Sequence, residues 1–319
     1  MKYYIGVDLG GTNIAVGIVN EEYKIVGRAS VKTNMPRPAE ASAEDIARAI
    51  GLAAQDAKIE VAECEWVGIG TPGSVDKRKG MVEYANNLNF HDVYLADMVG
   101  KYVGKPIYLE NDANAAAYGE ALAGAGRGVD NMIMLTLGTG VGGGMIINGK
   151  IYGGFTNMGA ELGHMGIVYN GRQCTCGRKG CIEAYCSATG LANITKDHMN
   201  EHPETEMWKM VGGDINKVNG RTAFDGMRKG DAVAKMVVDE YMEYFTYAVA
   251  NYLNIFQPEV LVVGGGVGKE GETLLAPLRE AVVSQTYVKK EENRTKILSA
   301  ELGNDAGIIG AAMLGNMAE

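Results

Sequence analysis

Apolar residues near the start of the chain occur in short alternating runs that are typical of β-strands. Three runs, Tyr3 to Asp8, Asn13 to Val19 and Lys24 to Arg28, are rich in β-branched and aromatic residues. Glycines and the polar stretch Asn-Glu-Glu separate them, and such residues favour turns. The pattern predicts a β-hairpin with a glycine turn, followed by a third strand.

The same design recurs in the stretch NMIMLTLGTGVGGGMIINGKIYGG. A strand that ends at Leu137 leads into a glycine-rich turn, and a second strand follows from Met145 to Ile147. Asn148 and Gly149 then predict a tight hairpin turn into a short third strand. The chain is therefore expected to contain an internal repeat.

Helical and extended patterns alternate after each of these sets, which predicts two α/β domains. We place the boundary near Asp112 from the repeat alone, giving domains at 1–111 and 112–302. The elements expected after the two sets are helices at 43–57, 113–123, 231–254, 273–284 and 306–314 and strands at 66–70, 106–109, 259–265 and 295–299.

The composition is that of a globular protein, with 319 residues of which 46% are hydrophobic and 22% charged. No run is long enough to span a membrane, and the N-terminus lacks the pattern of a secretory signal. We therefore expect a cytoplasmic protein with reduced cysteines. A formal net charge of −9 argues against nucleic-acid binding but not against a nucleotide cofactor.

The glycine turns DLGGTN and LGTGVGGG predict contact with phosphates, because glycine lets backbone N–H groups approach an anion closely. Asp8 supplies the carboxylate that Mg²⁺ prefers beside phosphates. The alternative is that these glycines only make tight hairpins. Two GxGxxG matches, beginning at Gly68 and Gly138, are not followed by a helix, which argues against a dinucleotide site. The later group VVGGGVG does lie between a strand and a helix, as nucleotide binding at a helix N-terminus requires.

Four side chains have the chemistry and spacing of a structural zinc site: His164, Cys174, Cys176 and Cys181. Gly177 and Gly180 would let the backbone double back between the ligands. The alternative is a group of buried thiols that pack as small apolar side chains. The stretch HMNEH at 198–202 matches an inverted zinc-protease pattern, but its polar surroundings favour a solvated helix end.

Asp112 is the strongest candidate for a catalytic residue, because it lies between a strand and an alanine-rich helix that would hold it rigidly. Its position also suits a helix N-cap, and position alone favours that reading.

The motifs DLGGTN, ENDANAAAYGE, LGTGVGGG, ELGH and CTCGRKGCIE, in this order, resemble the ROK family of sugar kinases and related repressors, most closely its bacterial glucokinases. The resemblance runs from about Tyr4 to Leu314. It implies an α/β fold of two actin-like, ribonuclease H-like ATPase domains around an interdomain cleft, with a structural zinc motif. It also implies that a C-terminal helix at about 303–319 returns to the first domain.

The resemblance implies transfer of the γ-phosphate of Mg-ATP to the 6-hydroxyl of glucose, with Asp112 as general base. Matching the family's motifs to this sequence implies three further sets of residues. Sugar binding is expected at Gly73, Asn86, Asn111, Asp112, Glu161, His164 and Glu183; nucleotide or Mg²⁺ binding at Asp8, Gly10, Gly11, Thr12, Asn13, Gly138, Thr139, Gly140, Gly265 and Gly266; and zinc at His164, Cys174, Cys176 and Cys181.

Two alternatives stay open. One is a kinase for another hexose or for an N-acetylhexosamine, and the other is a sugar-responsive repressor, which the acidic charge disfavours. Polyphosphate as donor and a homodimer or tetramer are also compatible with the resemblance.

Overall fold

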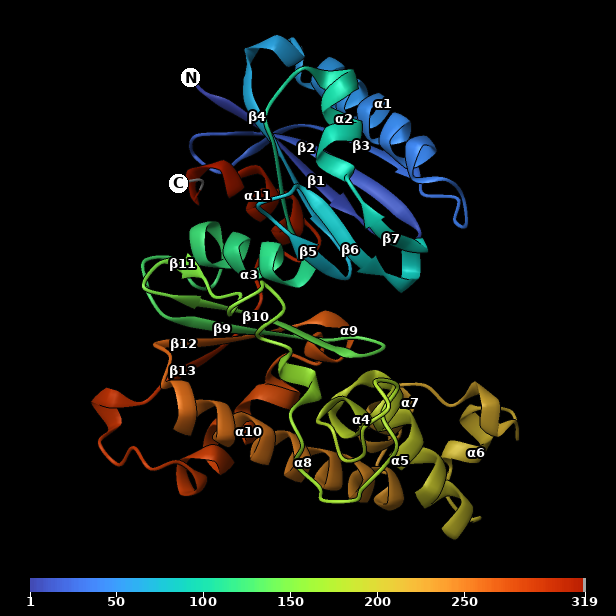
Figure 1. Ribbon diagram of the computed structural model, residues 1–319. Helices are drawn as coiled ribbons and strands as arrows, with labels where there is room; N and C mark the ends of the chain where they lie inside the picture. Colours follow the sequence, from blue (N-terminus) through green and yellow to red (C-terminus); the bar gives the residue numbers. More distant parts are fainter. Residues whose placement is uncertain (318–319) are drawn as a thin grey trace. The chain divides into compact units, whose positions relative to one another are not determined.

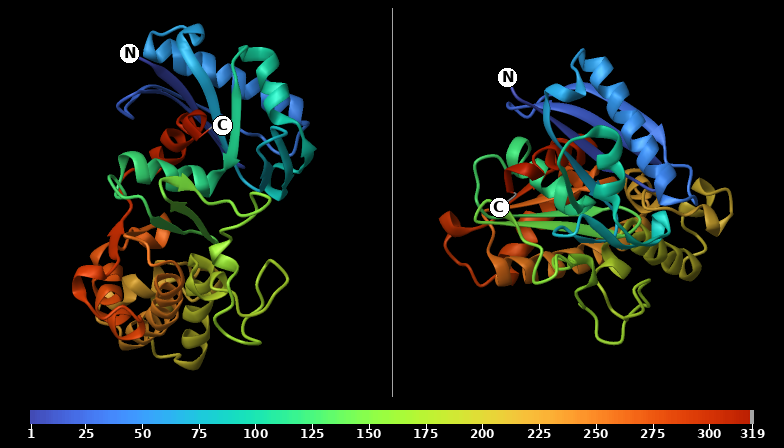
Figure 2. Two further views of the ribbon diagram at one scale, coloured as in Figure 1. Left: turned by 60° about the vertical axis from the view of Figure 1, so that its left-hand side comes forward. Right: turned by 45° about the horizontal axis from the view of Figure 1, so that its top comes forward.

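The computed structural model describes residues 1–317, which form two compact units. Unit 1 consists of residues 1–133, 144–160 and those from 301 onward, and unit 2 of residues 134–143 and 161–300. Figures 1 and 2 trace the chain through both units. The domain boundary expected near Asp112 stays a prediction, and the last two residues of the expected C-terminal helix lie outside the described residues.

The main sheet of unit 1 has the strand order β3-β2-β1-β4-β8, in which β1 pairs antiparallel with β2 and parallel with β4. The sheet is therefore mixed, with a hairpin joined to two parallel strands. Its strands are β1 (Tyr3–Leu9), β2 (Asn13–Asn20), β3 (Ile25–Lys32), β4 (Cys64–Thr71) and β8 (Ile107–Asn111).

The two faces of β1 carry different side chains because successive residues of a strand point to opposite sides. Ile5 and Val7 face a core shared with α1 (Ala39–Ala57) and α2 (Leu95–Val103). Gly6 faces α11 (Asp305–Ala312) so closely that a Cβ there would lie 1.9 Å from the carbonyl oxygen of Ile308. Asp8, two residues on, therefore lies on the α11 face.

A three-stranded sheet of β5 (Ser74–Asp76), β6 (Met81–Ala85) and β7 (Phe90–Val93) completes the extended structure between β4 and α2. Residues 74–80 are rich in charge, which is typical of a loop, but the first three of them form a strand. Val75 is fully buried, and Ser74 and Asp76 pair with β6, so the charged side chains flank a strand. The helix α2 was not among the predicted elements.

The second five-stranded sheet has the order β11-β10-β9-β12-β13. Its strands are β9 (Met132–Leu137), β10 (Val141–Ile147), β11 (Lys150–Ile151), β12 (Val260–Gly264) and β13 (Lys296–Ser299). The predicted strand from Met145 was too short at its start, because Gly142 to Gly144 belong to β10 rather than to the turn. Gly143 lies against Leu162, where a Cβ would come within 2.8 Å of that side chain.

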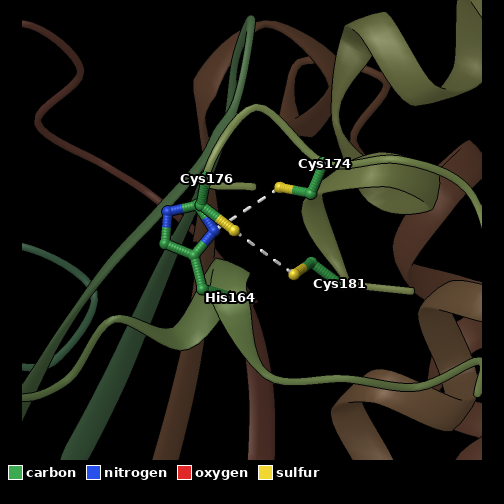
Figure 3. A group of neighbouring side chains, drawn as sticks. All are labelled: His164, Cys174, Cys176 and Cys181. Carbon is green, nitrogen blue, oxygen red and sulfur yellow. Dashed lines mark hydrogen bonds between the residues drawn. The ribbon is translucent and has the colours of Figure 1, made fainter. Parts of the chain in front are cut away.

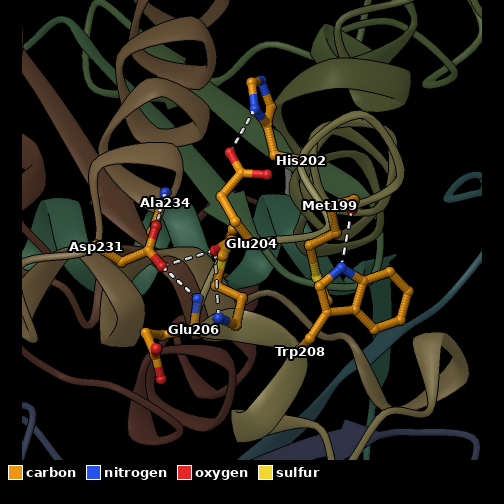
Figure 4. A network of polar contacts seen from close by, with 9 residues as sticks. Met199, His202, Glu204, Glu206, Trp208, Asp231 and Ala234 are labelled. Atoms are coloured by element: carbon orange, nitrogen blue, oxygen red, sulfur yellow. Dashed lines mark hydrogen bonds and ion pairs between the residues drawn. The ribbon is translucent and has the colours of Figure 1, made fainter.

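The helices of unit 2 include the predicted long helix, α8 (Ala232–Phe256). Asp231 caps it by accepting a hydrogen bond from the Ala234 N–H, and its carboxylate also binds Thr205 and Glu206 (Figure 4). The others are α4 (Glu183–Cys186), α5 (Ala188–Glu201), α6 (Met207–Met210), α7 (Thr222–Arg228), α9 (Gly265–Gly268) and α10 (Glu272–Gln285). Unit 1 also contains α3 (Asp112–Ala123). None of the helices formed by residues 1–317 is both long and apolar enough to cross a membrane.

Candidate functional site

The four predicted zinc ligands come together in unit 2, with their ligand atoms within 4.8 Å of one another (Figure 3). The Sγ atoms of Cys176 and Cys181 are 3.7 Å apart, and so are Cys174 Sγ and His164 Nδ1. Ligands about 2.3 Å from a tetrahedral zinc ion lie about 3.8 Å from each other. These two separations therefore match a tetrahedral zinc site, and the remaining pairs of ligand atoms lie within 4.8 Å.

Backbone contacts build this arrangement, which we call the knot (His164 and residues 174–181). Gly177 and Gly180 have φ of +90° and +80°, as expected for a chain that doubles back. The N–H of Cys174 donates to the carbonyl of Arg178, at 2.9 Å. The guanidinium of Arg178 donates to the carbonyl of His164, also at 2.9 Å, and so ties the distant ligand to the loop.

Glu183 begins α4, directly after the knot. Its Oε1 accepts a hydrogen bond from the Thr175 hydroxyl at 2.9 Å, and its Oε2 accepts one from the Val141 N–H at 3.1 Å. The carboxylate is thus fixed at both oxygens, toward the knot on one side and toward β10 on the other. Glu161 is exposed at the start of the short 3₁₀ turn Leu162–His164.

The turn between β9 and β10 closes through a hydrogen bond from the Gly138 N–H to the Gly140 carbonyl, at 3.0 Å. Thr189 donates its hydroxyl to the carbonyl of Thr139 at 2.7 Å, and the Ala188 N–H donates to the carbonyl of Gly138 at 2.8 Å. The start of α5 therefore holds the turn that the sequence predicts to bind phosphate.

Steric room separates glycines that the fold requires from those that it does not. A Cβ on Gly265, at φ +82°, would lie 2.5 Å from the backbone of Leu137, so packing alone explains this glycine. A Cβ on Gly11, Gly138 or Gly266 would meet no protein atom closer than 3.4 Å. The fold thus leaves these three glycines unexplained, whereas close approach of a nucleotide would explain them.

In unit 1, the hairpin turn after β1 is held by Thr33. Its hydroxyl donates to the carbonyl of Gly10 at 2.7 Å, and its N–H donates to the carbonyl of Thr12 at 3.0 Å. The turn borders a cavity of about 690 Å³. The cavity is lined by Asp8, Gly10, Gly11, Thr12, Asn13, Ala15, Val16, Arg28, Ala29, Ser30, Asn304, Asp305 and Ile308.

Two carboxyl groups of unit 1 have raised pKa values. Burial and, to a smaller extent, the negative charge of Asp112 together raise the pKa of Asp8 to about 6. Burial also raises the pKa of Asp112, although the backbone N–H of Ala113 and the Asn111 side chain oppose this. Repulsion between two partly buried carboxylates is the situation that a bound cation relieves.

Asn111, and not Asp112, caps α3. The Asn111 side chain accepts hydrogen bonds from the N–H groups of Ala113 at 2.9 Å and Asn114 at 3.2 Å. The alternative that Asp112 is the N-cap of this helix, which its position alone favoured, is therefore wrong. Asp112 begins the helix itself and keeps a carboxylate that the helix does not need as its cap.

The loop that contains Gly73, which is expected to bind sugar, is hydrogen-bonded to Asn111 at the start of α3. Gly73 has φ +91°, and a Cβ there would lie 2.0 Å from the carbonyl of Tyr84. The Asn111 amide donates to the Gly73 carbonyl at 3.2 Å. Asn86 is exposed and accepts a hydrogen bond from the Tyr84 hydroxyl at 3.4 Å.

Several residues that support the site were not predicted from the sequence. Glu110 is almost fully buried, pairs with Lys77 and accepts hydrogen bonds from the Asn111 N–H and the Asn114 amide, at 2.9 and 3.1 Å. Glu110 stands inside the motif ENDAN, which was its only signal. Thr33, Thr175 and Thr189 carried no signal, since an isolated threonine is common in loops and helix starts.

The HMNEH stretch does not form a metal site. His198 Nε2 lies 2.7 Å from Glu240. His202 Nδ1 lies 3.1 Å from Glu204 (Figure 4). The helix α5 ends at Glu201, which confirms the prediction that this stretch is the end of a helix. Within residues 1–317, the group of metal-binding side chains that comes together is the knot.

Comparison with known proteins identifies the family. The model of the ROK family matches residues 4–317. The chain is 40% identical over 315 residues to a glucokinase of Thermotoga maritima, covering 97% of this chain and 96% of that protein. A crystal structure of a ROK family glucokinase from Streptomyces griseus in complex with glucose and AMPPNP matches with 37% identity and a TM-score of 0.80, over 99% of this chain and 100% of that one. A ROK hexokinase from Thermus thermophilus matches with 30% identity and a TM-score of 0.82, over 98% of this chain and 97% of that one.

This chain belongs to the ROK family. Its fold is α/β with mixed sheets, in agreement with the actin-like fold of ROK sugar kinases.

Proposed function

We propose that the protein is an ATP-dependent glucokinase, which transfers the γ-phosphate of Mg-ATP to the 6-hydroxyl of glucose. The observation that carries the proposal is Asp112, a raised-pKa carboxylate at the start of α3 whose capping role is taken by Asn111. Likeness to glucokinases over nearly the whole chain supports the choice of sugar and donor.

Asp112 acts as general base in this proposal. It accepts the proton of the 6-hydroxyl as that oxygen forms a bond to the γ-phosphorus, while the bond from the γ-phosphorus to the bridging oxygen breaks and ADP leaves. Such a transfer depends mainly on positioning and charge neutralisation, so one well-placed carboxylate suffices at the nucleophile. A raised pKa makes the carboxylate a better proton acceptor at neutral pH.

The nucleotide is proposed to bind at both glycine turns. Gly10, Gly11, Thr12 and Asn13 hold phosphate in unit 1, and Gly138, Thr139 and Gly140 do so in unit 2, with Gly265 and Gly266 near the adenosine. Asp8 would hold Mg²⁺, which neutralises phosphate charge. The steric room at Gly11, Gly138 and Gly266 supports this assignment.

The sugar is proposed to contact Asn111, Asp112, Glu161, His164 and Glu183, with Gly73 and Asn86 as further contacts. His164 Nδ1 faces the thiol of Cys174, so the other ring nitrogen is the one available for a sugar hydroxyl. A zinc ion held by the knot would orient these side chains without entering the reaction, as in closed four-ligand sites.

An N-acetylhexosamine kinase is the second candidate, because carboxylates such as Glu161 and Glu183 suit the hydroxyls of either sugar. A repressor role is disfavoured by the net charge of −9. We further propose a homodimer located in the cytoplasm.

The test is product analysis. Purified protein with Mg-ATP and glucose should yield ADP and a sugar phosphate whose phosphorus couples to the C6 protons in NMR spectra. Phosphorylation at another position, or ATP hydrolysis without sugar phosphate, would refute the proposed reaction.

A further inference from the structure

The knot and the β9–β10 turn are joined by a continuous set of short contacts within unit 2. The contacts run from Thr175 in the knot, through the carboxylate of Glu183, to the Val141 N–H at the start of β10. A second link runs from the start of α5 to the same turn, through Thr189 and Ala188. Residues 183–189 therefore contact the turn at both of its ends.

We infer that the knot organises the phosphate-binding turn at residues 138–141 as well as the sugar-binding carboxylates, and that Thr175 and Thr189 are positioning residues for nucleotide binding. This inference rests on the proposed function, since it takes the turn to be a nucleotide site.

The first link depends on Thr175 in particular. Cys174 Sγ also lies 3.4 Å from Glu183 Oε1, but a thiolate that binds a metal ion has no proton to donate. The Thr175 hydroxyl, at 2.9 Å, is then the donor that keeps Oε1 in place. With Oε1 fixed, Oε2 is held against the turn.

The fit between Glu183 and the turn is tight. A Cβ on Gly140 would lie 2.3 Å from Glu183 Oε2, so this glycine gives the carboxylate room to reach the Val141 N–H. Any movement of Glu183 toward β10 would therefore displace the turn backbone. Restraint of this kind matters because a phosphate site works through N–H groups fixed in advance.

The second link is independent of the knot ligands. Thr189 lies in the first turn of α5, is exposed, and donates to the carbonyl of Thr139 at 2.7 Å. The carbonyl of Gly138 accepts from the Ala188 N–H, so the adjacent peptide groups of the turn are both anchored. Ser187 caps this helix through its contact with the Gly190 N–H, which fixes the position of Thr189.

The experiment measures binding of Mg-AMPPNP by titration calorimetry without sugar, together with zinc content. Thr175→Val and Thr189→Val should each weaken binding about fivefold, since each loses one hydrogen bond of ordinary strength. Thr175→Ser and Thr189→Ser keep the hydroxyl and should bind within about twofold of wild type. Thr195→Val is the matched control, because its hydroxyl also donates at 2.7 Å but to Leu191 within α5.

Wild-type affinity in both valine variants would overturn the inference while leaving the proposed function intact. Absence of AMPPNP binding by the wild type would overturn both. If Thr175→Val loses zinc, unchanged nucleotide affinity in that variant would contradict the role of the knot. The Thr189 pair tests the second link separately, because Thr189 does not contact the knot, and unchanged affinity in Thr189→Val would contradict the positioning role of Thr189.

Discussion

Asp8 and Asp112 are two acids of unit 1, and the charge of Asp112 affects the ionisation of Asp8. The charge of Asp112 contributes to the pKa of about 6 at Asp8. Among the ion pairs formed by residues 1–317, neither carboxylate has a cationic partner, in contrast to the buried Glu110, which pairs with Lys77. At the residue scale, this difference supports our proposal that Asp8 and Asp112 serve the chemistry, whereas Glu110 serves the fold.

Asp112→Asn should lower turnover by at least about a hundredfold, because an amide cannot accept the hydroxyl proton. The melting temperature should stay close to that of wild type, since Asn111 keeps α3 capped. Asp97→Asn, which changes an exposed acid on α2, is the matched control and should retain wild-type turnover. Near wild-type turnover in Asp112→Asn would remove Asp112 as the base.

Asp8 should make the protein without nucleotide and Mg²⁺ less stable as pH rises. Its pKa is about 6 in the folded state and 3.8 for the ordinary group, so the folded state binds the proton more tightly. The free energy of unfolding therefore falls between pH 4 and pH 6, by up to about 3 kcal/mol from this group.

Asp8→Asn removes this penalty and should raise the free energy of unfolding at pH 7, measured by urea denaturation at pH 4 and pH 7. The gain over wild type should be larger at pH 7 than at pH 4. An equal effect at both pH values would show that Asp8 titrates normally in the folded state.

At the scale of elements, the β9–β10 turn offers a test that separates ligand binding from folding. A Cβ on Gly138 would meet only the Gly140 carbonyl, at 4.0 Å, so Gly138→Ala should leave the melting temperature unchanged. It should weaken Mg-AMPPNP binding about tenfold, because the methyl group occupies the space of a phosphate oxygen.

Gly51→Ala is the control for this substitution, since Gly51 is exposed in α1 with open space around it. It should bind nucleotide as wild type does and raise the free energy of unfolding by about 0.5–1 kcal/mol. Unchanged affinity in Gly138→Ala would exclude this turn as a phosphate site.

The knot gives a second test at this scale. Cys176→Ser should abolish the binding of about one zinc ion per chain, since a hydroxyl is a poor replacement for a thiolate. Sugar affinity should fall with it. Zinc content is measured by mass spectrometry after gel filtration, with Cys64→Ala, a buried cysteine outside the knot, as control. Full zinc occupancy in Cys176→Ser would refute this set of ligands.

The sequence predicted helices and strands best where the hydrophobic pattern repeated regularly over many positions. The strands β1 and β2 and the helix α8 were found almost to the residue, because each alternates or repeats regularly over seven or more positions. The strand β5 was missed because only Val75 among its three residues is buried. The four side chains of the knot were predicted to come together, because cysteine spacing and metal chemistry leave few other interpretations, and their binding of zinc stays a prediction.

Contacts between elements could not be predicted in this way. The hydroxyls of Thr175 and Thr189 act through partners 8 and 50 positions away in the chain, and single threonines carry no pattern. The capping of α3 by Asn111 also required coordinates, because Asn111 and Asp112 are adjacent and both are good caps.

At the scale of the whole molecule, the glycine content has two separate origins. Gly6 and Gly68 on neighbouring strands allow α11 to pack directly on the sheet, where Cβ atoms would lie 1.9 and 1.7 Å from its backbone oxygens. Gly11, Gly138 and Gly266 have no such reason within the fold. We therefore assign two roles to glycine in this chain. One group lets a helix pack closely on the sheet, and the other is proposed to leave backbone N–H groups accessible to a nucleotide.

The most direct test of the account is sugar-dependent release of ADP from Mg-ATP. Initial rates are compared for glucose, mannose, fructose, glucosamine, N-acetylglucosamine and N-acetylmannosamine, with Asp112→Asn as the blank. The account predicts the highest kcat/KM for glucose and no rate above background for the variant. A dominant rate with an N-acetylhexosamine would change the substrate, and no sugar-dependent ADP release with any sugar would contradict the account as a whole.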